Sequence, residues 1–238
     1  MLAMKGHALI VLAGGSGARM GAGINKQLLT LGGSTITEIA LKQLLSKGHW
    51  EQVVLVAAKK DWDAISGVAH KVSIECGVAI DQVAGGTERQ FSVANGIGAL
   101  KPEIHTVWIH DGARPFVESD LIARLALAID KENAVIPALP SKDTLKRVVA
   151  EVVQSTLKRS EIFRIQTPQC FKRDLLENMQ KLNQAEGDFT DDASMAEALG
   201  IDVHVVLGSE WNIKLTTPED MITGSAIYEY LKGVGKCV

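Results

Sequence analysis

The amino-acid sequence predicts an α/β fold in which a Rossmann-like, mostly parallel sheet is flanked by helices. Short runs rich in β-branched apolar residues alternate along the chain with segments of helical period, which is the pattern of a parallel sheet with helices on its faces. Helix-capping signals stand between these runs. Hydrophobic residues make up 46% of the chain and charged residues 22%, which is typical of a globular protein and excludes wholesale disorder.

Seven short apolar runs are predicted to be the strands. They are His7–Ala13, Gln52–Ala57, Val78–Val83, Thr106–His110, Ala134–Ala138, Val203–Leu207 and Ile213–Leu215.

The first well-marked helix is predicted over Thr35–Lys47. Its apolar residues fall on one face, Thr35 and Glu38 have the spacing of a capping box, and Gly48 is expected to stop the helix.

Two further helices have recognisable beginnings. A second capping box, Thr87 to Gln90, is predicted to open a helix that runs to Leu100. The last helix is predicted to start with Thr217 as its cap and Pro218 at its first helical position.

One stretch departs from the alternation and predicts a β-arm at about residues 139–159. The β-like runs 143–149 and 152–157 are separated only by Ala150 and Glu151, as in a hairpin. An exposed arm with apolar residues leaves unpaired edges that a partner subunit can cover, so we expect a dimer. Since no linker, repeat or low-complexity tract is present, residues 1–238 are predicted to form one domain that carries this arm.

Charge and cysteine content exclude several classes of protein. The 25 Lys and Arg against 28 Asp and Glu give a net charge of −3, so nothing indicates a nucleic-acid partner. The three cysteines, Cys76, Cys170 and Cys237, are far apart and form no CxxC pair, as expected in a reducing compartment. The apolar start is too short for a membrane span and shows no signal-peptide cleavage pattern. We therefore expect a cytoplasmic protein that does not bind a membrane.

A glycine-rich turn follows the first predicted strand, where residues 13–21 read AGGSGARMG. Glycines allow backbone N–H groups to approach a phosphate closely, and Arg19 and Lys26 add two cations to the same loop. The Walker pattern fails because its lysine is missing, and the dinucleotide pattern GxGxxG fails because Met20 replaces the last glycine. From these residues alone, two interpretations remain: a tight turn that binds no ligand, or a triphosphate-binding site.

Two later segments have the same character. GGTERQFSV at 85–93 is either a phosphate-binding turn or a simple strand-to-helix turn. HDGARP at 110–115 follows a strand, where open α/β sheets bind ligands. Asp111 could bind a metal or a sugar hydroxyl there and Arg114 a phosphate, or the two could form a loop salt bridge.

Absent motifs narrow the chemistry. The sequence has no HExxH and no GxSxG, which disfavours hydrolysis through a covalent intermediate. A phosphate monoester, by contrast, is mostly dianionic near neutral pH and needs no general base to act as a nucleophile. Catalysis then requires Arg, Lys, backbone N–H groups and Mg²⁺ to bring two polyanions together.

In order, the segments AGGSGARMG with KQ, GGTERQFSV, HDGARPF, DTLK, Arg159 leading into QTPQCF, FTDDAS and NIKLTTPED span residues 13–220. Taken together, they resemble the 2-C-methyl-D-erythritol 4-phosphate cytidylyltransferases of the non-mevalonate isoprenoid pathway. The resemblance implies a fold of the nucleotide-diphospho-sugar transferase type and a homodimer with interlocked arms. It also implies transfer of a cytidylyl group from CTP to methylerythritol phosphate, with release of pyrophosphate.

The resemblance also implies roles for individual residues. Arg19 and Lys26 would stabilise charge on the α-phosphate, while Arg159 and Lys214 would position the acceptor phosphate, Arg159 in the neighbouring subunit's site. Mg²⁺ would bridge the phosphates of CTP, with no protein ligands assigned. The binding residues implied are Ala13, Gly14, Gly15 and Gly17 for the triphosphate, Gly85, Gly86, Thr87 and Ser92 for cytosine and ribose, and Asp111, Arg114, Thr144 and Thr167 for the acceptor, with Gly112 beside them.

Four positions depart from the family pattern. Gly14 replaces a common Ala, Asn25 a common Pro, and Gly112 a common Ala, and we expect these changes to affect only loop stiffness. Lys158 stands where an acidic residue usually precedes the Arg, which puts the arm's local salt bridges in question.

Three alternatives to this interpretation differ in the residues they require. The related ribitol 5-phosphate cytidylyltransferases share similar segments, but Arg89-Gln90 with Ser92-Val93, and Lys146, favour methylerythritol phosphate. A non-catalytic nucleotide-binding protein would be favoured if Arg19 or Lys26 were missing. Met20 argues against a nicotinamide-dependent dehydrogenase.

Overall fold

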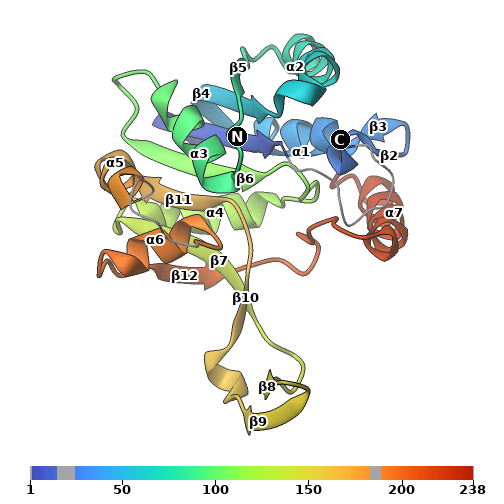
Figure 1. Ribbon diagram of the computed structural model, residues 1–238. Coiled ribbons are helices and arrows are strands. Elements are labelled where there is room, and N and C mark those ends of the chain that lie inside the picture. Colours follow the sequence, from blue (N-terminus) through green and yellow to red (C-terminus); the bar gives the residue numbers. More distant parts are fainter. Residues whose placement is uncertain (1, 15–24, 183–188, 238) are drawn as a thin grey trace.

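The computed structural model describes residues 2–14, 25–182 and 189–237, which form an α/β body and an arm (Figure 1). Eight strands make up the central sheet: β1 (Leu2–Ala13), β4 (Gly48–Ala57), β5 (Asp81–Ala84), β6 (Thr106–Asp111), β7 (Ala134–Pro140), β10 (Phe163–Ile165), β11 (Gln169–Lys172) and β12 (His204–Leu207). Their order is β10-β7-β11-β6-β1-β4-β5, and β12 also pairs with β7. Strands β10 and β11 are antiparallel to their neighbours and the other pairs are parallel. The predicted mostly parallel sheet is therefore confirmed.

Helices cover both faces of the sheet, so its central strands are buried on both sides. In β1, Leu9 and Val11 face one core while Ala8 and Ile10 face the other, and all four are fully buried. This explains why β1 is apolar at successive positions rather than at alternate ones. One core lies under α1 (Ile36–Leu45), α2 (Trp62–Cys76) and α4 (Ser119–Ile129), and the other under α3 (Arg89–Gly98), α5 (Arg173–Leu182) and α6 (Asp192–Ala198).

A third, smaller core lies where α7 (Pro218–Gly233) meets α1 and the short strands β2 (Thr30–Leu31) and β3 (Ser34–Thr35). Leu215 and Phe116 are buried in it. The 3₁₀ helices are η2 (Lys26–Leu28), η3 (Lys59–Asp61) and η4 (Arg159–Glu161).

Two of the three predicted helix starts are confirmed. The Thr35 hydroxyl accepts a hydrogen bond from the Glu38 N–H, and Thr217 caps α7 in a reciprocal box with Asp220. The prediction for Thr87 is wrong, because α3 begins at Arg89 and its N-cap, Glu88, makes no side-chain capping bond.

Two further predictions need correction. The first helix ends at Leu45, and Gly48 is the first residue of β4 rather than a helix stop. Ile213–Leu215 is not a strand. The Leu215 side chain is buried as the apolar pattern requires, but its N–H donates to the Ala113 carbonyl in a loop instead of to a strand.

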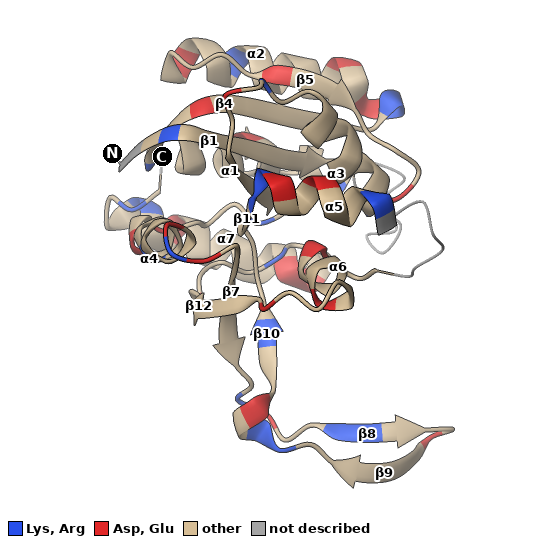
Figure 2. Ribbon diagram, turned by 90° about the vertical axis from the view of Figure 1, so that its left-hand side faces the viewer, with Lys and Arg blue, Asp and Glu red and all other residues tan. Residues whose placement is uncertain are grey.

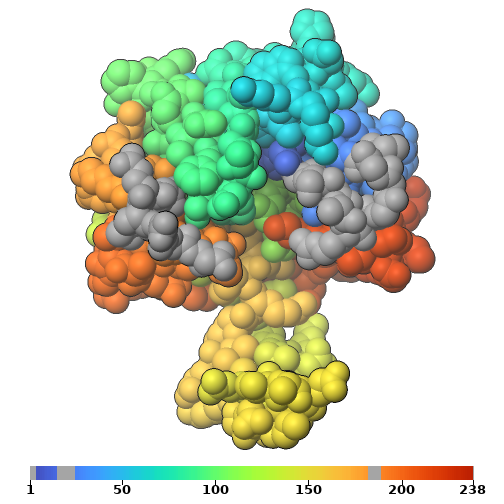
Figure 3. All heavy atoms as spheres, viewed as in Figure 1, coloured from blue at the N-terminus to red at the C-terminus, as the bar shows by residue number. Residues whose placement is uncertain are grey.

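The predicted arm is a two-stranded hairpin of β8 (Lys146–Val149) and β9 (Val152–Thr156). Ala150 and Glu151 at its turn have φ angles of 47° and 65°, the left-handed pair that matches the twist of a two-residue hairpin. Figures 1 and 2 show the arm standing off the body, and Figure 3 shows the narrow neck that joins them.

Among the described residues, no helix has the length and apolar character needed to cross a membrane.

Candidate active site

The carboxyl ends of β1, β4, β5 and β6, which pair in parallel, lie at one edge of the sheet. Leu12 lies beside Asp111 in the register of β1 and β6, and the Gly112 N–H donates to the Leu12 carbonyl at 3.0 Å. On the other side of β1, the Gly85 N–H donates to the Ala57 carbonyl at 2.8 Å. Since open α/β sheets bind ligands at this edge, these turns are candidates for one site.

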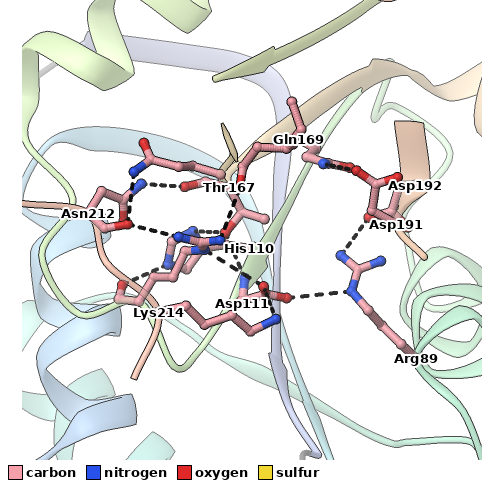
Figure 4. Close-up of polar contacts among 12 residues, drawn as sticks. Arg89, His110, Asp111, Thr167, Gln169, Asp191, Asp192, Asn212 and Lys214 are labelled. Carbon is pink, nitrogen blue, oxygen red and sulfur yellow. Dashed lines mark hydrogen bonds and ion pairs between the residues drawn. The ribbon is translucent and has the colours of Figure 1, made fainter. Parts of the chain in front are cut away.

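Asp111 is the centre of a cluster of charges at this edge (Figure 4). Its Oδ2 lies 2.7 Å from Lys214 Nζ and 3.8 Å from Arg114 Nε, and its Oδ1 lies 3.5 Å from Arg89 Nε. Burial alone would raise the pKa of Asp111, but the Arg89, Lys214 and Arg114 cations together hold it well below its usual range. Three cations around one carboxylate leave positive charge available for an anionic ligand.

Asp111 is held in place from behind by His110 and Thr167. The Asp111 N–H donates to Thr167 Oγ1 at 3.1 Å, and this hydroxyl also lies 3.0 Å from His110 Nδ1. His110 Nε2 lies 2.9 Å from the Arg114 carbonyl, which can only accept, so we assign the proton to Nε2 and let Nδ1 accept from Thr167. Burial lowers the pKa of His110 to about 4, which fits this neutral ring.

Lys214 reaches the cluster on a segment without regular structure. The Asn212 Nδ2 donates to the Thr167 carbonyl at 2.8 Å, and the Leu215 N–H donates to the Ala113 carbonyl at 2.9 Å. These bonds lie on either side of Lys214 in the chain and fix its backbone against the turn that follows Asp111.

Arg114 connects this segment to the base of the arm. Its guanidinium donates from Nη1 to the Asn212 carbonyl at 2.8 Å and from Nη2 to the Ile165 carbonyl at 3.2 Å. Ile165 is the last residue of β10, which returns from the arm to the sheet. Arg114 therefore holds backbone at the edge of the site.

Arg89 brings a second carboxylate to the cluster, and sequence reasoning did not assign it. Its Nη2 lies 2.7 Å from Oδ2 of Asp192, whose side chain is completely buried. Asp191 caps α6 in a capping box, and the Gln169 amide donates to Asp191 at 2.8 Å. The motif GGTERQ marked Arg89 as a candidate residue, but the sequence alone does not show that it pairs with Asp192, which is distant in the chain.

The second glycine turn is closed by Ser92. The Ser92 hydroxyl accepts from the Gly86 N–H and donates to the Glu88 carbonyl, both at 3.1 Å. A Cβ on Gly86 would lie 2.3 Å from Phe91 Cβ, so only glycine fits there. Because Ser92 closes the turn, Thr87 is left exposed and does not cap α3.

The described part of the first loop brings Lys26 to the same edge. Lys26 is buried at the start of η2, and Gly14 follows β1. The preceding Asn25 is 1% exposed and donates to the Ala13 carbonyl at 3.1 Å and to Asp61 Oδ2 at 2.9 Å. The predicted site residues Gly15, Gly17 and Arg19 lie outside the described residues.

Thr144 lies two residues before β8, and Arg159 begins η4 shortly after β9, so both belong to the segment that carries the arm. Both are exposed, and Arg159 donates to the Lys142 carbonyl at 3.3 Å. Lys158 put the local salt bridges of the arm in question, and the structure shows that its ammonium pairs with Glu161. The local salt bridge is thus formed with the acidic residue three positions further along the chain.

An open α/β sheet with a glycine turn and clustered cations at its carboxyl edge is typical of enzymes that bind phosphate-bearing ligands there, the nucleotidyltransferases among them. The family model described as 2-C-methyl-D-erythritol 4-phosphate cytidylyltransferase matches residues 7–230, and the chain belongs to this family. The match confirms the resemblance noted in the sequence.

Relatives and solved structures agree with this assignment. The 2-C-methyl-D-erythritol 4-phosphate cytidylyltransferase of Halalkalibacterium halodurans is 41% identical over 222 residues, covering 93% of this chain and 96% of the relative. The crystal structure of 4-diphosphocytidyl-2C-methyl-D-erythritol synthase from Anaerococcus prevotii is similar with a TM-score of 0.83 and 34% identity, over 95% of this chain and 96% of that one. The 2-C-methyl-D-erythritol 4-phosphate cytidylyltransferase of Thermus thermophilus has a TM-score of 0.74 and 27% identity, over 92% and 97%.

Proposed function

We propose that the protein transfers a cytidylyl group from CTP to 2-C-methyl-D-erythritol 4-phosphate, giving 4-diphosphocytidyl-2-C-methyl-D-erythritol and pyrophosphate in isoprenoid biosynthesis. The observation that carries this proposal is the family match over residues 7–230, a span that contains every segment of the edge described above. The charges of the Asp111 cluster suit an anionic acceptor that also carries hydroxyl groups.

The reaction needs charge stabilisation rather than a base. An oxygen of the acceptor phosphate attacks the α-phosphorus of CTP, a new P–O bond forms, and the bond to the β-phosphate breaks to release pyrophosphate. Since the acceptor phosphate is largely dianionic near neutral pH, no proton has to be removed. We assign stabilisation of the α-phosphate charge to Lys26 and Arg19.

The binding roles divide between the two sides of β1. On one side, the turn containing Gly85, Gly86, Thr87 and Ser92 is proposed to bind cytosine and ribose, and residues 13–17 the triphosphate. On the other side, we assign the acceptor phosphate to Lys214 and its hydroxyl groups to Asp111. Thr167 and Arg114 support this side through their hydrogen bonds to backbone.

A divalent metal fits this site as a companion of the nucleotide. Among the residues that the structure describes, no group of three or more His, Cys, Asp and Glu could hold a metal ion, and both oxygens of Asp111 face cationic side chains. Mg²⁺ commonly takes phosphate oxygens and water as its ligands. We therefore propose that it binds with CTP, where it would neutralise phosphate charge.

The arm is proposed to form a homodimer. Val148, Val149, Val152 and Val153 are 53–60% exposed on the hairpin, an apolar surface that a second subunit would cover. If Arg159 serves the partner's site, mixing Arg159→Ala chains with Lys26→Ala chains restores activity, because the mixed dimer has one intact composite site. No recovery despite verified subunit exchange would contradict the shared site. The cytoplasmic location stays a prediction.

The test of the main proposal is pyrophosphate release. The pure protein is incubated with CTP, Mg²⁺ and either methylerythritol phosphate or ribitol 5-phosphate. Rapid release with methylerythritol phosphate alone is expected. Release with ribitol phosphate alone would refute the acceptor, and CTP binding without release from either would favour a non-catalytic nucleotide-binding protein.

A further inference from the structure

The two oxygens of Asp111 have different partners, and this difference carries an inference about Arg89 (Figure 4). Oδ1 faces Arg89 Nε at 3.5 Å, whereas Oδ2 faces Lys214 Nζ at 2.7 Å. The inference rests on the function proposed above. We propose that Arg89 is a positioning residue that holds Asp111 in place through Oδ1 while Lys214 leaves Oδ2 and a hydroxyl group of the acceptor binds there instead.

Arg89 is fixed on the side away from Asp111. Its Nη2 lies 2.7 Å from Asp192, which is 0% exposed and stands at the first residue of α6. The Gln169 side chain holds that helix end by donating to Asp191 and accepting from the Ala193 N–H at 3.2 Å. Arg89 therefore bridges a rigid buried carboxylate and the carboxylate at the sheet edge.

Lys214 differs from Arg89 in the ways that favour exchange. Its side chain is 38% exposed, against 28% for Arg89, and it lies on a segment without helix or strand. An acceptor phosphate near two negative charges competes with a single carboxylate for this ammonium. When Lys214 turns to the phosphate, Oδ2 of Asp111 becomes available to accept a hydroxyl of the acceptor.

When Lys214 turns away, Asp111 has one cation fewer beside it. The remaining neighbours then determine whether its carboxylate stays ionised and how it is oriented. The groups that face it are Arg114 from the following turn, the neutral buried His110 behind it, and Arg89 from α3, with Asp192 beyond Arg89. Arg114 Nε is 3.8 Å from Oδ2, and its two Nη groups are occupied by backbone carbonyls. Arg89 and Arg114 thus both help to keep Asp111 ionised, and among the described residues Arg89 is the cation that faces Oδ1.

The experiment compares Arg89→Gln, Asp192→Asn and the double variant with the wild-type enzyme. Arg89→Gln alone removes the cation that pairs with the buried Asp192, and among the described residues one oxygen of Asp192 already has no hydrogen-bond partner. The double variant removes this penalty, because both side chains are then neutral amides. Arg173→Gln is the control, since it breaks an arginine–carboxylate pair with Glu177 and the hydrogen bonds of Arg173 to the Lys101 and Ile104 carbonyls, none of which involves Asp111.

We expect Arg89→Gln and the double variant to raise the KM for methylerythritol phosphate by about tenfold or more, while the Kd for CTP changes less than about twofold. Asp192→Asn, which frees Arg89, should change the acceptor KM in the same direction by less. Arg173→Gln should leave both quantities unchanged.

Two results would overturn the inference. An equal loss of CTP affinity would place Arg89 in the nucleotide site, and a wild-type acceptor KM in the double variant would show that Arg89→Gln acts only by stranding Asp192. Wild-type turnover of methylerythritol phosphate, measured first, tests the proposed function separately from the role of Arg89.

Discussion

Replacing Asn25 by Asp should remove the hydrogen bonds that attach the loop carrying Lys26 to Ala13 and Asp61. The Asn25 amide donates to the Ala13 carbonyl at 3.1 Å and to Asp61 at 2.9 Å, while its oxygen accepts from the Gln27 N–H at 3.1 Å. An aspartate keeps the shape but replaces the donor group with an oxygen. That oxygen would face a carbonyl and a carboxylate at hydrogen-bonding distance.

The expected loss of stability follows from these contacts. Asn25→Ala removes three hydrogen bonds and leaves buried polar groups unpaired, which costs about 2–4 kcal/mol of unfolding free energy. Asn25→Asp should cost about 1–3 kcal/mol more at neutral pH, since it places a second carboxylate against the partly exposed Asp61. Repulsion raises the folded-state pKa of the pair above its unfolded value. This extra loss is therefore present above that folded pKa and disappears as the pH falls through it, when a shared proton restores a donor.

Urea unfolding of the two variants and the wild type at pH 7.5 and pH 5 tests this reasoning. The Asn25→Asp variant should approach the Asn25→Ala variant or exceed it in stability at the lower pH, whereas Asn25→Ala should keep its deficit relative to wild type. Equal stabilities of the two variants at both pH values would refute the role given to the Asn25 donor.

Three further predictions concern other parts of the molecule. Burial and the neighbouring His105 lower the pKa of His7 to about 4 from 6.5, so the contribution of His7 to the unfolding free energy should fall by about 3 kcal/mol between pH 7 and pH 4, as the unfolded chain takes up the proton. In urea titrations, the unfolding free energy of His7→Asn should therefore depend less on pH than that of the wild type, and an equal dependence would contradict this prediction. Gly86→Ala should weaken CTP binding and lower the free energy of unfolding in urea by about 1–3 kcal/mol, because the new methyl group forces the turn to shift. Gly98→Ala is the control, since open space surrounds this position, and it should not be destabilising. Lys26→Ala should lower kcat by about 10³-fold with CD unchanged, and near-normal turnover would exclude the proposed role.

The parts of the fold that sequence reasoning predicted are those that local signals determine. The apolar run of β1 is buried on both faces, and Thr35 and Thr217 cap their helices with bonds to residues only three positions away. The hairpin turn at Ala150 and Glu151 is likewise local. Each of these features depends on a few neighbouring residues, so it can be predicted from the sequence.

The missed features depend on contacts between distant segments. Strand β11 enters the sheet antiparallel between β6 and β7, and no local pattern gives this position. Arg89 and Asp192 meet only because α3 and α6 cover the same face of the sheet. Asn25 was expected to affect only loop stiffness, but two of its three hydrogen bonds reach distant residues, Ala13 and Asp61. The charges at the edge were visible in the motifs, while their pairing was not.

The order of the chain separates the members of the Asp111 cluster in time during synthesis. Asp111 and Arg89 are translated before their ion-pair partners Lys214 and Asp192. Both ion pairs can therefore close only after most of the chain has been made. A chain that ended before residue 214 would lack the cation nearest to Asp111 Oδ2.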